Sequence, residues 1–219
     1  MLEVANSADV KIRWVDSERI SSYNVDEMLG GVHGILVPGD RRSVESKDDL
    51  CDQIRKRKQD PISWTMLRNA ATLVEFGRHV LGFSDAHSQE FNPDTTHPMV
   101  HIMADQDGVT DLGGTLRLGS YPCVLTEGSK AYELYGEKEI HERHRHRYEV
   151  NNEYRDILQE NGMMLSGCSP DGRIVEMVEI PEHPWFVATQ AHPEFKSRPN
   201  KAHPLFKGFV EAALEHQGK

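Results

Sequence analysis

The chain has 219 residues, of which 37% are hydrophobic and 27% are charged, and its formal net charge is −10 at pH 7. This length suits one large α/β domain or two small ones. An acidic chain lacks the basic face with which proteins bind nucleic acid, and no apolar run is long enough to span a membrane, so we expect neither partner. The three cysteines are widely spaced, which indicates a reducing, cytoplasmic location rather than a disulfide framework.

The first part of the chain alternates strand-like and polar segments. Residues 10–15 alternate apolar and polar side chains, which predicts a strand. Gly34-Ile-Leu-Val-Pro38 is a short apolar run before a glycine and predicts a buried parallel strand. Residues 40–60 are densely charged, so a helix there would have only a thin apolar face.

The next elements follow the same alternation. Residues 61–67 are compatible with a strand, and residues 70–81 predict an amphipathic helix that ends before Gly82. Residues 85–98 are polar and are expected to form a loop. From residue 111 onward we expect strands within 111–125, a helical turn at 131–135, a helix at 151–161, a hairpin of 163–168 and 174–180, a buried strand at 185–188 and a helix at 204–214.

The buried strand at 185–188 leads into a polar turn that holds His192 and Glu194. A histidine with a pKa near neutrality can move protons, and a neighbouring carboxylate can fix its tautomer. The pair would supply two thirds of a nucleophilic triad, which leaves the nucleophile to be found. A solvated turn without chemistry is the alternative.

Arg143-His-Arg-His-Arg147 is a basic cluster in an acidic chain. Arginine can grip a carboxylate with two parallel hydrogen bonds, whereas a solvated strand is the alternative. His144 and His146 could suggest a metal, but no third ligand stands at a metal-like spacing, so we expect no metal site.

None of the cysteines is a convincing nucleophile. Cys51 lies inside a charged, helix-like run rather than at a strand-to-helix turn. Cys123 and Cys168 lie on predicted strands and are expected to be small packing residues.

Five stretches of the chain together resemble the C-terminal glutaminase domain of CTP synthases. They are Gly34-Ile-Leu-Val-Pro-Gly39, Glu90-Phe-Asn-Pro-Asp94, Asp111-Leu-Gly-Gly-Thr-Leu-Arg-Leu-Gly119, Glu142-Arg-His-Arg-His-Arg-Tyr-Glu-Val-Asn151 and Phe186-Val-Ala-Thr-Gln-Ala-His-Pro-Glu-Phe195. The resemblance implies a class I glutamine amidotransferase-like (flavodoxin-like) α/β fold over residues 1–219. Its central sheet would be mostly parallel and flanked by helices, with an added antiparallel hairpin region.

The resemblance also implies a Cys-His-Glu triad, in which a thiolate attacks the carboxamide of glutamine and backbone amides stabilise the oxyanion. His192 would be the acid/base and Glu194 its orienting partner. Glu90 and Arg147 would hold the ammonium and carboxylate of glutamine, and Gly39 would lie beside the oxyanion. This domain would need no cofactor, because ATP and Mg²⁺ belong to a separate synthetase domain that aminates UTP.

The chain is expected to depart from the family in three respects, the third of which is its catalytic middle. No segment of the sequence resembles the synthetase domain, and the family has a further strand and most of a helix before the segment that matches Val10. The oxyanion loop Gly-Gly-Phe-Gly is replaced by Gly39-Asp-Arg-Arg42. The nucleophile elbow aligns with residues 64–70, so that Met66 stands where the family has its cysteine.

The genetic code offers an explanation for residues 40–71. Read one nucleotide later, the codons of Trp64 and Thr65 give glycine, and those of Met66 and Leu67 give cysteine, whichever synonymous codons are used. The codons that follow permit Gly-Met-Gln, so the family's elbow is available in the shifted frame. We therefore expect that residues 40–71 are translated out of frame between two compensating indels, with ordinary divergence as the alternative.

The sequence accordingly predicts the glutaminase portion of a CTP synthase that does not hydrolyse glutamine. A second reading is a catalytically dead module that binds glutamine and regulates a partner. A third is a chain that does not fold stably, because a charged segment replaces apolar elements of the core.

Overall fold

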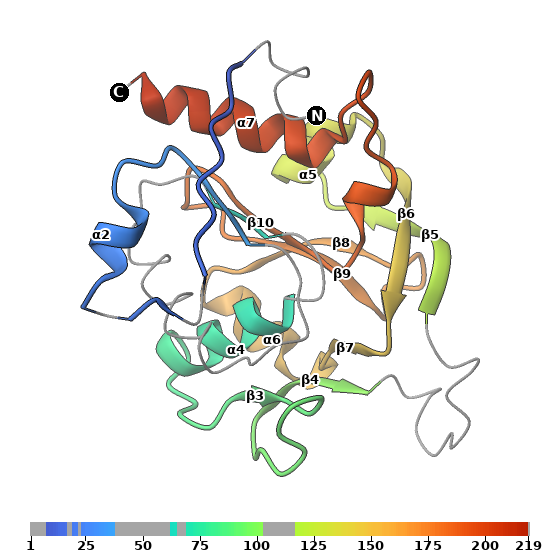
Figure 1. The fold of residues 1–219 in the computed structure, drawn as a ribbon. Coiled ribbons are helices and arrows are strands. Elements are labelled where there is room, and N and C mark those ends of the chain that lie inside the picture. The colour runs from blue at the N-terminus through green and yellow to red at the C-terminus, as the bar shows by residue number, and fades with distance from the viewer. Residues whose placement is uncertain are drawn as a thin grey trace.

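The computed structural model describes residues 8–16, 19–21, 23–37, 62–64, 69–102 and 117–218. A seven-stranded sheet with the order β1-β2-β10-β9-β8-β5-β6 occupies the centre, and a three-stranded sheet, β3-β4-β7, lies at one end of the molecule (Figure 1). Within the described ranges, no helix is both long and apolar enough to cross a membrane.

One side of the central sheet is parallel and carries three of the predicted strands. β1 (Ile35–Val37) pairs with β2 (Ile62–Trp64), and β2 pairs with β10 (Phe186–Thr189), both in parallel. Since Val37 and Ala188 both lie opposite Trp64, the three carboxyl ends meet at one edge of the sheet.

The other side of the sheet is antiparallel and larger than expected. It contains β9 (Val175–Glu179), β8 (Met164–Cys168), β5 (Arg117–Leu125) and β6 (Glu139–His146). The predicted hairpin of β8 and β9 is confirmed. The expectation of a mostly parallel sheet therefore holds only for β1, β2 and β10, although the fold class itself is confirmed.

Helices cover both faces of the sheet (Figure 1). α4 (Asn69–His79) and α6 (Arg155–Glu160), which follows the short η3 (Asn152–Tyr154), share one apolar core, whereas α5 (Lys130–Tyr135) and α7 (Pro204–Gln217) share the other. α2 (Val25–Leu29) lies beside the first core. The predicted helices at 70–81, 131–135, 151–161 and 204–214 are thus confirmed, the last extending further than expected.

β10 shows why helices can pack on both faces of the sheet. All four of its residues are buried. Phe186 and Ala188 belong to the core under α4, whereas Val187 belongs to the core under α7. A strand buried on both faces reads as a continuous apolar run, which is the pattern that predicted it.

The small sheet corrects one expectation. It contains β3 (His87–Ser88), β4 (Pro98–Ile102) and β7 (Tyr148–Val150). The segment 85–98 was expected to be loop throughout, but β3 pairs in parallel with β4, with residues 89–97 as the connection that brings the chain back alongside in the same direction. Such a short strand leaves no periodicity in the sequence.

The predicted strand at 10–15 is wrong. The segment is irregular, with Trp14 and Ile12 exposed by 87% and 63%. A strand exists only if its backbone groups pair with a neighbour, and no strand of the described ranges pairs with this segment. Residues 40–60 lie outside the described residues, so the expected charged helix stays a prediction.

Candidate active site

His192 and Glu194 form a direct pair at the end of β10. His192 Nδ1 lies 2.8 Å from Glu194 Oε1, and the imidazole is 3% exposed whereas the carboxylate is 39% exposed. Glu194 belongs to the short helix η4 (Pro193–Phe195), and the His192 backbone N–H donates to the Arg143 carbonyl oxygen at 2.8 Å. The ring also stacks on Phe195 with centroids 4.8 Å apart. The turn is therefore held in place by contacts of its own side chains and backbone, and it is not merely a solvated loop.

The contact with Glu194 decides the tautomer of His192. A carboxylate only accepts, so Nδ1 carries the proton and Nε2 keeps its lone pair. His192 Nε2 is buried and has no hydrogen-bond partner among the described residues. A buried basic nitrogen that is held in orientation but left unused is what a general acid/base requires.

The nucleophile position and the oxyanion position lie outside the described residues, but their place along the chain is informative. Met66 stands between the end of β2 at Trp64 and the start of α4 at Asn69. Gly39 follows the end of β1, and His192 follows the end of β10. Loops at the carboxyl ends of adjacent parallel strands are where α/β proteins place their chemistry.

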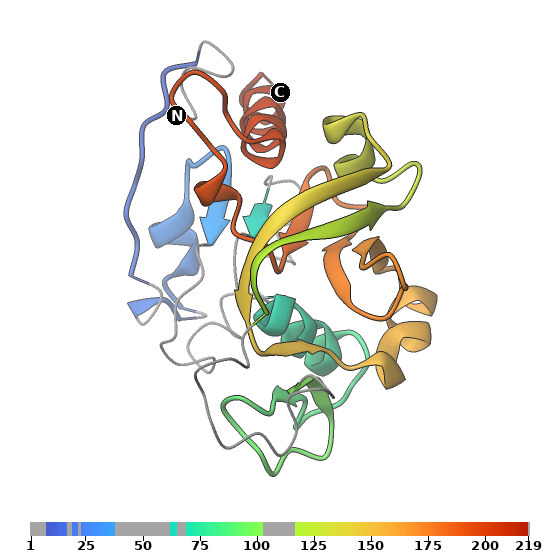
Figure 2. The same ribbon diagram turned by 90° about the vertical axis from the view of Figure 1, so that its right-hand side faces the viewer.

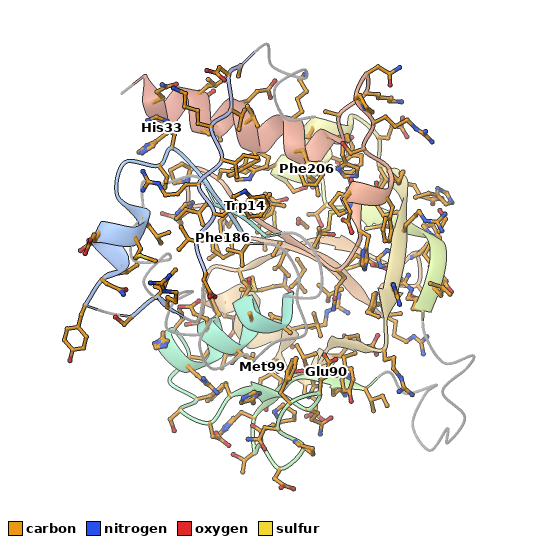
Figure 3. The ribbon with its side chains drawn as sticks, in the orientation of Figure 1. Trp14, His33, Glu90, Met99, Phe186 and Phe206 are labelled. Atoms are coloured by element: carbon orange, nitrogen blue, oxygen red, sulfur yellow. The ribbon has the colours of Figure 1, made fainter. Side chains whose placement is uncertain are left out.

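Glu90 and Arg147 are both placed by the small sheet. Glu90 follows β3, and its backbone N–H donates to the Ser88 hydroxyl at 3.3 Å (Figure 3). Arg147 is the single residue between β6 of the large sheet and β7 of the small one, and its Nε is buried without a hydrogen-bond partner in the described part of the chain. Of the predicted site residues, His192 and Glu194 are seen in direct contact with each other.

The basic cluster has two different faces. Burial alternates along β6, so that His144 and His146 point inward at 2% exposure while Arg143 and Arg145 are exposed. The solvated-strand alternative describes Arg143 and Arg145 but not the two histidines, and the grip on a carboxylate stays a prediction. The arginines are the solvated face, whereas the histidines are part of the core.

The buried histidines meet Glu176, which the sequence analysis missed. His144 Nε2 lies 3.1 Å from Glu176 Oε2, and Arg117 forms an ion pair with the other oxygen of the same carboxylate. Burial raises the pKa of Glu176 to about 7 against the opposing effect of Arg117. The signal in the sequence was a glutamate inside the apolar strand Ile174-Val-Glu-Met-Val178, since a buried charge must find a partner.

Glu176 also corrects the argument against a metal. The sequence offered no third ligand, but one ligand atom from each of His144, His146 and Glu176 lies within 4.8 Å of the others. The Arg117 guanidinium already places a positive charge on that carboxylate. Because a cation there would be repelled, we assign no metal to this cluster.

Glu142 on β6 stabilises the turn that holds His192 and Glu194. Its Oε1 accepts from Tyr135 at 3.0 Å, from Lys196 at 3.0 Å and from His203 at 3.1 Å. Lys196 follows η4 directly and also donates to the His141 carbonyl oxygen. The chain beyond Glu194 is therefore tied to β6.

The two described cysteines are packing residues, as expected. Cys123 is fully buried, Cys168 is half-buried, and both are free thiols. Burial raises the pKa of both thiols, which opposes formation of a thiolate. Cys51 lies outside the described residues.

Comparison with known proteins identifies the family. The family model described as glutamine amidotransferase class-I matches residues 4–212. The CTP synthase of Geobacillus kaustophilus is 49% identical over 213 residues, which cover 96% of this chain and 40% of that protein. The CTP synthase of Staphylococcus saprophyticus is 51% identical over 211 residues, with 95% and 39% covered. The chain thus spans about two fifths of the length of these curated relatives.

A solved structure narrows the assignment. The glutaminase domain of Trypanosoma brucei CTPS, with bound acivicin, superposes with a TM-score of 0.88 at 34% identity. The match covers 98% of this chain and 84% of that one. The chain therefore belongs to the class-I glutamine amidotransferase family, and within it to the glutaminase domains of CTP synthases.

Proposed function

We propose that this chain is the glutamine-handling domain of a CTP synthase and that, as written, it does not hydrolyse glutamine because Met66 occupies the nucleophile position. In the intact family enzyme, ammonia released here would reach a synthetase domain that uses ATP and Mg²⁺ to convert UTP to CTP. The cytoplasm is the proposed location.

The observation that carries the proposal is the parallel register of β2 with β10. Ala188 lies opposite Trp64, so the chain that leads to Met66 and the chain that leads to His192 leave the sheet at the same edge. A strand that ends shortly before a helix is also the setting that a nucleophile elbow needs, and β2 precedes α4 in this way.

The chemistry expected at this edge has a proton acceptor but no proton donor. His192 Nε2 is oriented to take a proton from a thiol. A methionine thioether has no proton to lose and cannot form the acyl-enzyme. Glutamine placed on Arg147 and Glu90 would therefore stay intact.

The direct test is an ammonia-release assay on the purified chain with glutamine. We expect no release above buffer, and the His192→Ala variant should be indistinguishable from the parent. Ammonia release that survives a thiol-blocking reagent and disappears in His192→Ala would refute the proposal that the chain is inactive.

The nucleotide sequence tests why the nucleophile is absent. If the shifted frame across residues 40–71 encodes Gly-x-Cys-x-Gly-Met-Gln, restoring that frame should give a chain that releases ammonia and loses this activity again with His192→Ala. A shifted frame that encodes another sequence rules out the frame explanation and leaves divergence.

A glutamine-binding module is the second candidate, favoured by the intact His192–Glu194 pair and by Arg147 Nε, which is buried and has no hydrogen-bond partner among the described residues. Calorimetry with glutamine distinguishes a glutamine-binding module from a broken copy of the enzyme domain. Micromolar binding that Arg147→Ala abolishes supports a module, whereas no binding indicates a broken copy of the enzyme domain.

A further inference from the structure

The loop that carries Glu90 is closed at its base by one carboxylate. Residues 89–97 connect β3 to β4, and Asp85 lies just before β3. Asp85 Oδ2 accepts from the Thr96 backbone N–H at 2.8 Å and from the Thr96 hydroxyl at 2.5 Å, while Asp85 Oδ1 lies 2.5 Å from His97 Nδ1. These three contacts form the Asp85 clasp, which joins the two ends of the loop.

The carboxylate of the clasp is ionised. Hydrogen bonds from Thr96 and His97 hold the pKa of Asp85 well below its usual range. An ionised carboxylate only accepts, so His97 Nδ1 carries the proton that it donates to Asp85. Hydrogen bonds to a charged acceptor are about twice as strong as those between neutral groups. The clasp can therefore hold the loop although the side chains of Asp85 and His97 are 42% and 34% exposed.

The His97 ring fixes the clasp to the rest of the domain. It stacks on Phe83 with ring centroids 4.3 Å apart and an angle of 12° between the planes. Phe83 in turn meets Tyr154 of η3 edge to face, with centroids 5.9 Å apart. The Thr95 hydroxyl also donates to the Asp85 carbonyl oxygen at 2.6 Å. The end of the loop is thus tied both to the segment before β3 and to η3.

The start of the loop depends on β3, which is very short. β3 has two residues, and its pairing with β4 shifts register between His87 and Ser88. The Ser88 hydroxyl accepts from the Glu90 backbone N–H at 3.3 Å. The Ser88 carbonyl oxygen accepts from the backbone N–H groups of Phe91 and Asn92 at 3.1 and 3.0 Å. The turn at Glu90 therefore lies where a two-residue strand places it, and that strand needs further support.

The small sheet places Glu90 and Arg147 at its two edges. β3 is one edge and β7, which follows Arg147 directly, is the other, with β4 between them. Figure 2 shows the chain around β3 and β4 at the end of the molecule away from α7, as does Figure 1. The β7 side is tied to β4 because the Asn151 side chain donates to the Pro98 carbonyl oxygen at 3.0 Å. Asp85 supplies the corresponding support on the β3 side.

We propose that Asp85 is a positioning residue of the glutamine site, which holds Glu90 at the separation from Arg147 that suits the α-ammonium and α-carboxylate of glutamine. Asp85 acts through the position of Glu90 and not through its own charge. The assignment of Glu90 and Arg147 to glutamine rests on the proposed function. The clasp does not, because it follows from the contacts of Asp85 with Thr96 and His97.

Amide hydrogen exchange on the full chain without glutamine tests the clasp. Asp85→Ala should speed exchange at the amides of residues 90–92 by about tenfold, although these amides donate to Ser88 rather than to Asp85. Asp85→Asn keeps an oxygen that accepts from Thr96, so its exchange at residues 90–92 should stay within about threefold of the parent.

Asp171→Ala is the matched control. Asp171 is an exposed carboxylate in the turn between β8 and β9, where it accepts from the Ser169 hydroxyl at 2.5 Å and from the Arg173 backbone N–H at 3.0 Å. It orders a turn as Asp85 does, but away from the small sheet, so the control should leave exchange at residues 90–92 unchanged. An equal change in the control, or no change in Asp85→Ala while the chain stays folded, would overturn the positioning role.

Calorimetry tests the role at the glutamine site, with glutamine and with glutaramate, which is glutamine without its α-amino group. Asp85→Ala should weaken glutamine binding by about tenfold, because a charge-assisted hydrogen bond to the ammonium is lost, but glutaramate binding by less than about twofold. Asp85→Asn should bind glutamine within about threefold of the parent. A loss as large as that of Asp85→Ala would mean that the charge of Asp85, and not the position of Glu90, acts on the ammonium.

Failure of this inference can be told apart from failure of the proposed function. A parent chain that binds neither compound overturns glutamine binding, and with it the role of Asp85 at that site. If the parent binds glutamine but Asp85→Ala weakens both compounds equally, or weakens neither, the chain has a glutamine site that Asp85 does not position.

Discussion

Two buried glutamates flank the His192 turn, and the pKa values of their carboxyls are shifted in opposite directions. Glu142 and Glu176 are exposed by 1% and 0%, and each contacts a buried histidine. Burial alone would raise the pKa of both carboxyls. The pKa of Glu142 is nevertheless lowered, because hydrogen bonds from His203 and Lys196 outweigh burial, whereas that of Glu176 is raised. Burial therefore does not decide the charge of a carboxyl in this core.

The difference lies in the hydrogen bonds that each carboxyl accepts from its neighbours. His203 Nδ1 accepts from the backbone N–H of Leu205 at 3.3 Å, so its proton is on Nε2 and is donated to Glu142. His144 Nε2 lies 3.1 Å from Glu176 Oε2, but neither atom has a hydrogen-bond partner among the described residues. The Glu176 carboxyl therefore gains no hydrogen bond from His144 that would offset the effect of burial on its pKa.

The largest expected effect comes from removing the ionised carboxylate. Glu142→Ala leaves the buried Tyr135 and His203 without their carboxylate acceptor and removes one of the two acceptors of Lys196, so we expect the free energy of unfolding to fall by about 4 kcal/mol. Urea denaturation measures it. A loss below about 1 kcal/mol would mean that the network around Glu142 is not a buried charge cluster.

The pH dependence of stability should have opposite slopes for the two groups. The folded-state pKa of Glu176 is raised to about 7 from its usual 4.5. The contribution of Glu176 to the free energy of unfolding is therefore full below pH 4.5 and is lost as the pH rises through about 7. The stability of the parent relative to Glu176→Gln should fall by about 3 kcal/mol across this window.

Glu142 should behave in the reverse sense. Its lowered pKa means that its contribution is present above pH 4.5 and is lost as the pH falls below that value. Urea denaturation of the parent, Glu142→Gln and Glu176→Gln between pH 3.5 and 8 gives both differences. Equal slopes for the two variants would remove the distinction between the carboxyls.

Replacement of each carboxyl by an amide at pH 6 is a smaller test of the same distinction. Glutamine resembles a protonated glutamate, so Glu176→Gln should cost less than about 1 kcal/mol. Glu142→Gln places an amide N–H among donors or removes the charge they surround, so it should cost about 2 kcal/mol. Thermal or urea unfolding of both variants under one condition measures the two losses of stability. Equal losses would contradict the conclusion that the two carboxyls have oppositely shifted pKa values.

The sequence predicted those parts of the fold that local pattern determines. β10, the β8–β9 hairpin and α7 follow from apolar runs, a turn sequence and helical periodicity, all of which are written within a few residues. The His192–Glu194 contact belongs to the same class, since two residues separated by one neighbour need only a turn to meet.

The parts that could not be predicted depend on contacts between distant segments. Residues 10–15 have a strand pattern without a strand partner. Glu176 meets His144 only because β5 and β6 curve across β9, and no spacing in the sequence encodes that curvature. What the sequence did contain was the anomaly of a glutamate in an apolar strand, which calls for a cationic or protonated partner without saying where it lies.

The smallest expected effect separates the buried network of Glu142 from an ordinary surface ion pair. Lys196 is 39% exposed while its partner Glu142 is buried, so Lys196→Ala should lower the free energy of unfolding by about 1 kcal/mol. Lys207→Ala is the matched control, because the Lys207–Glu211 pair at 3.4 Å is exposed on both sides and should contribute less than about 0.5 kcal/mol. Because Lys196 ties the chain after Glu194 to β6, its removal should also let the Glu194 turn move, which the line width of the His192 imidazole signals would report. Equal stabilities for Lys196→Ala and Lys207→Ala, with unchanged His192 signals, would show that Tyr135 and His203 alone hold Glu142 in its ionised state.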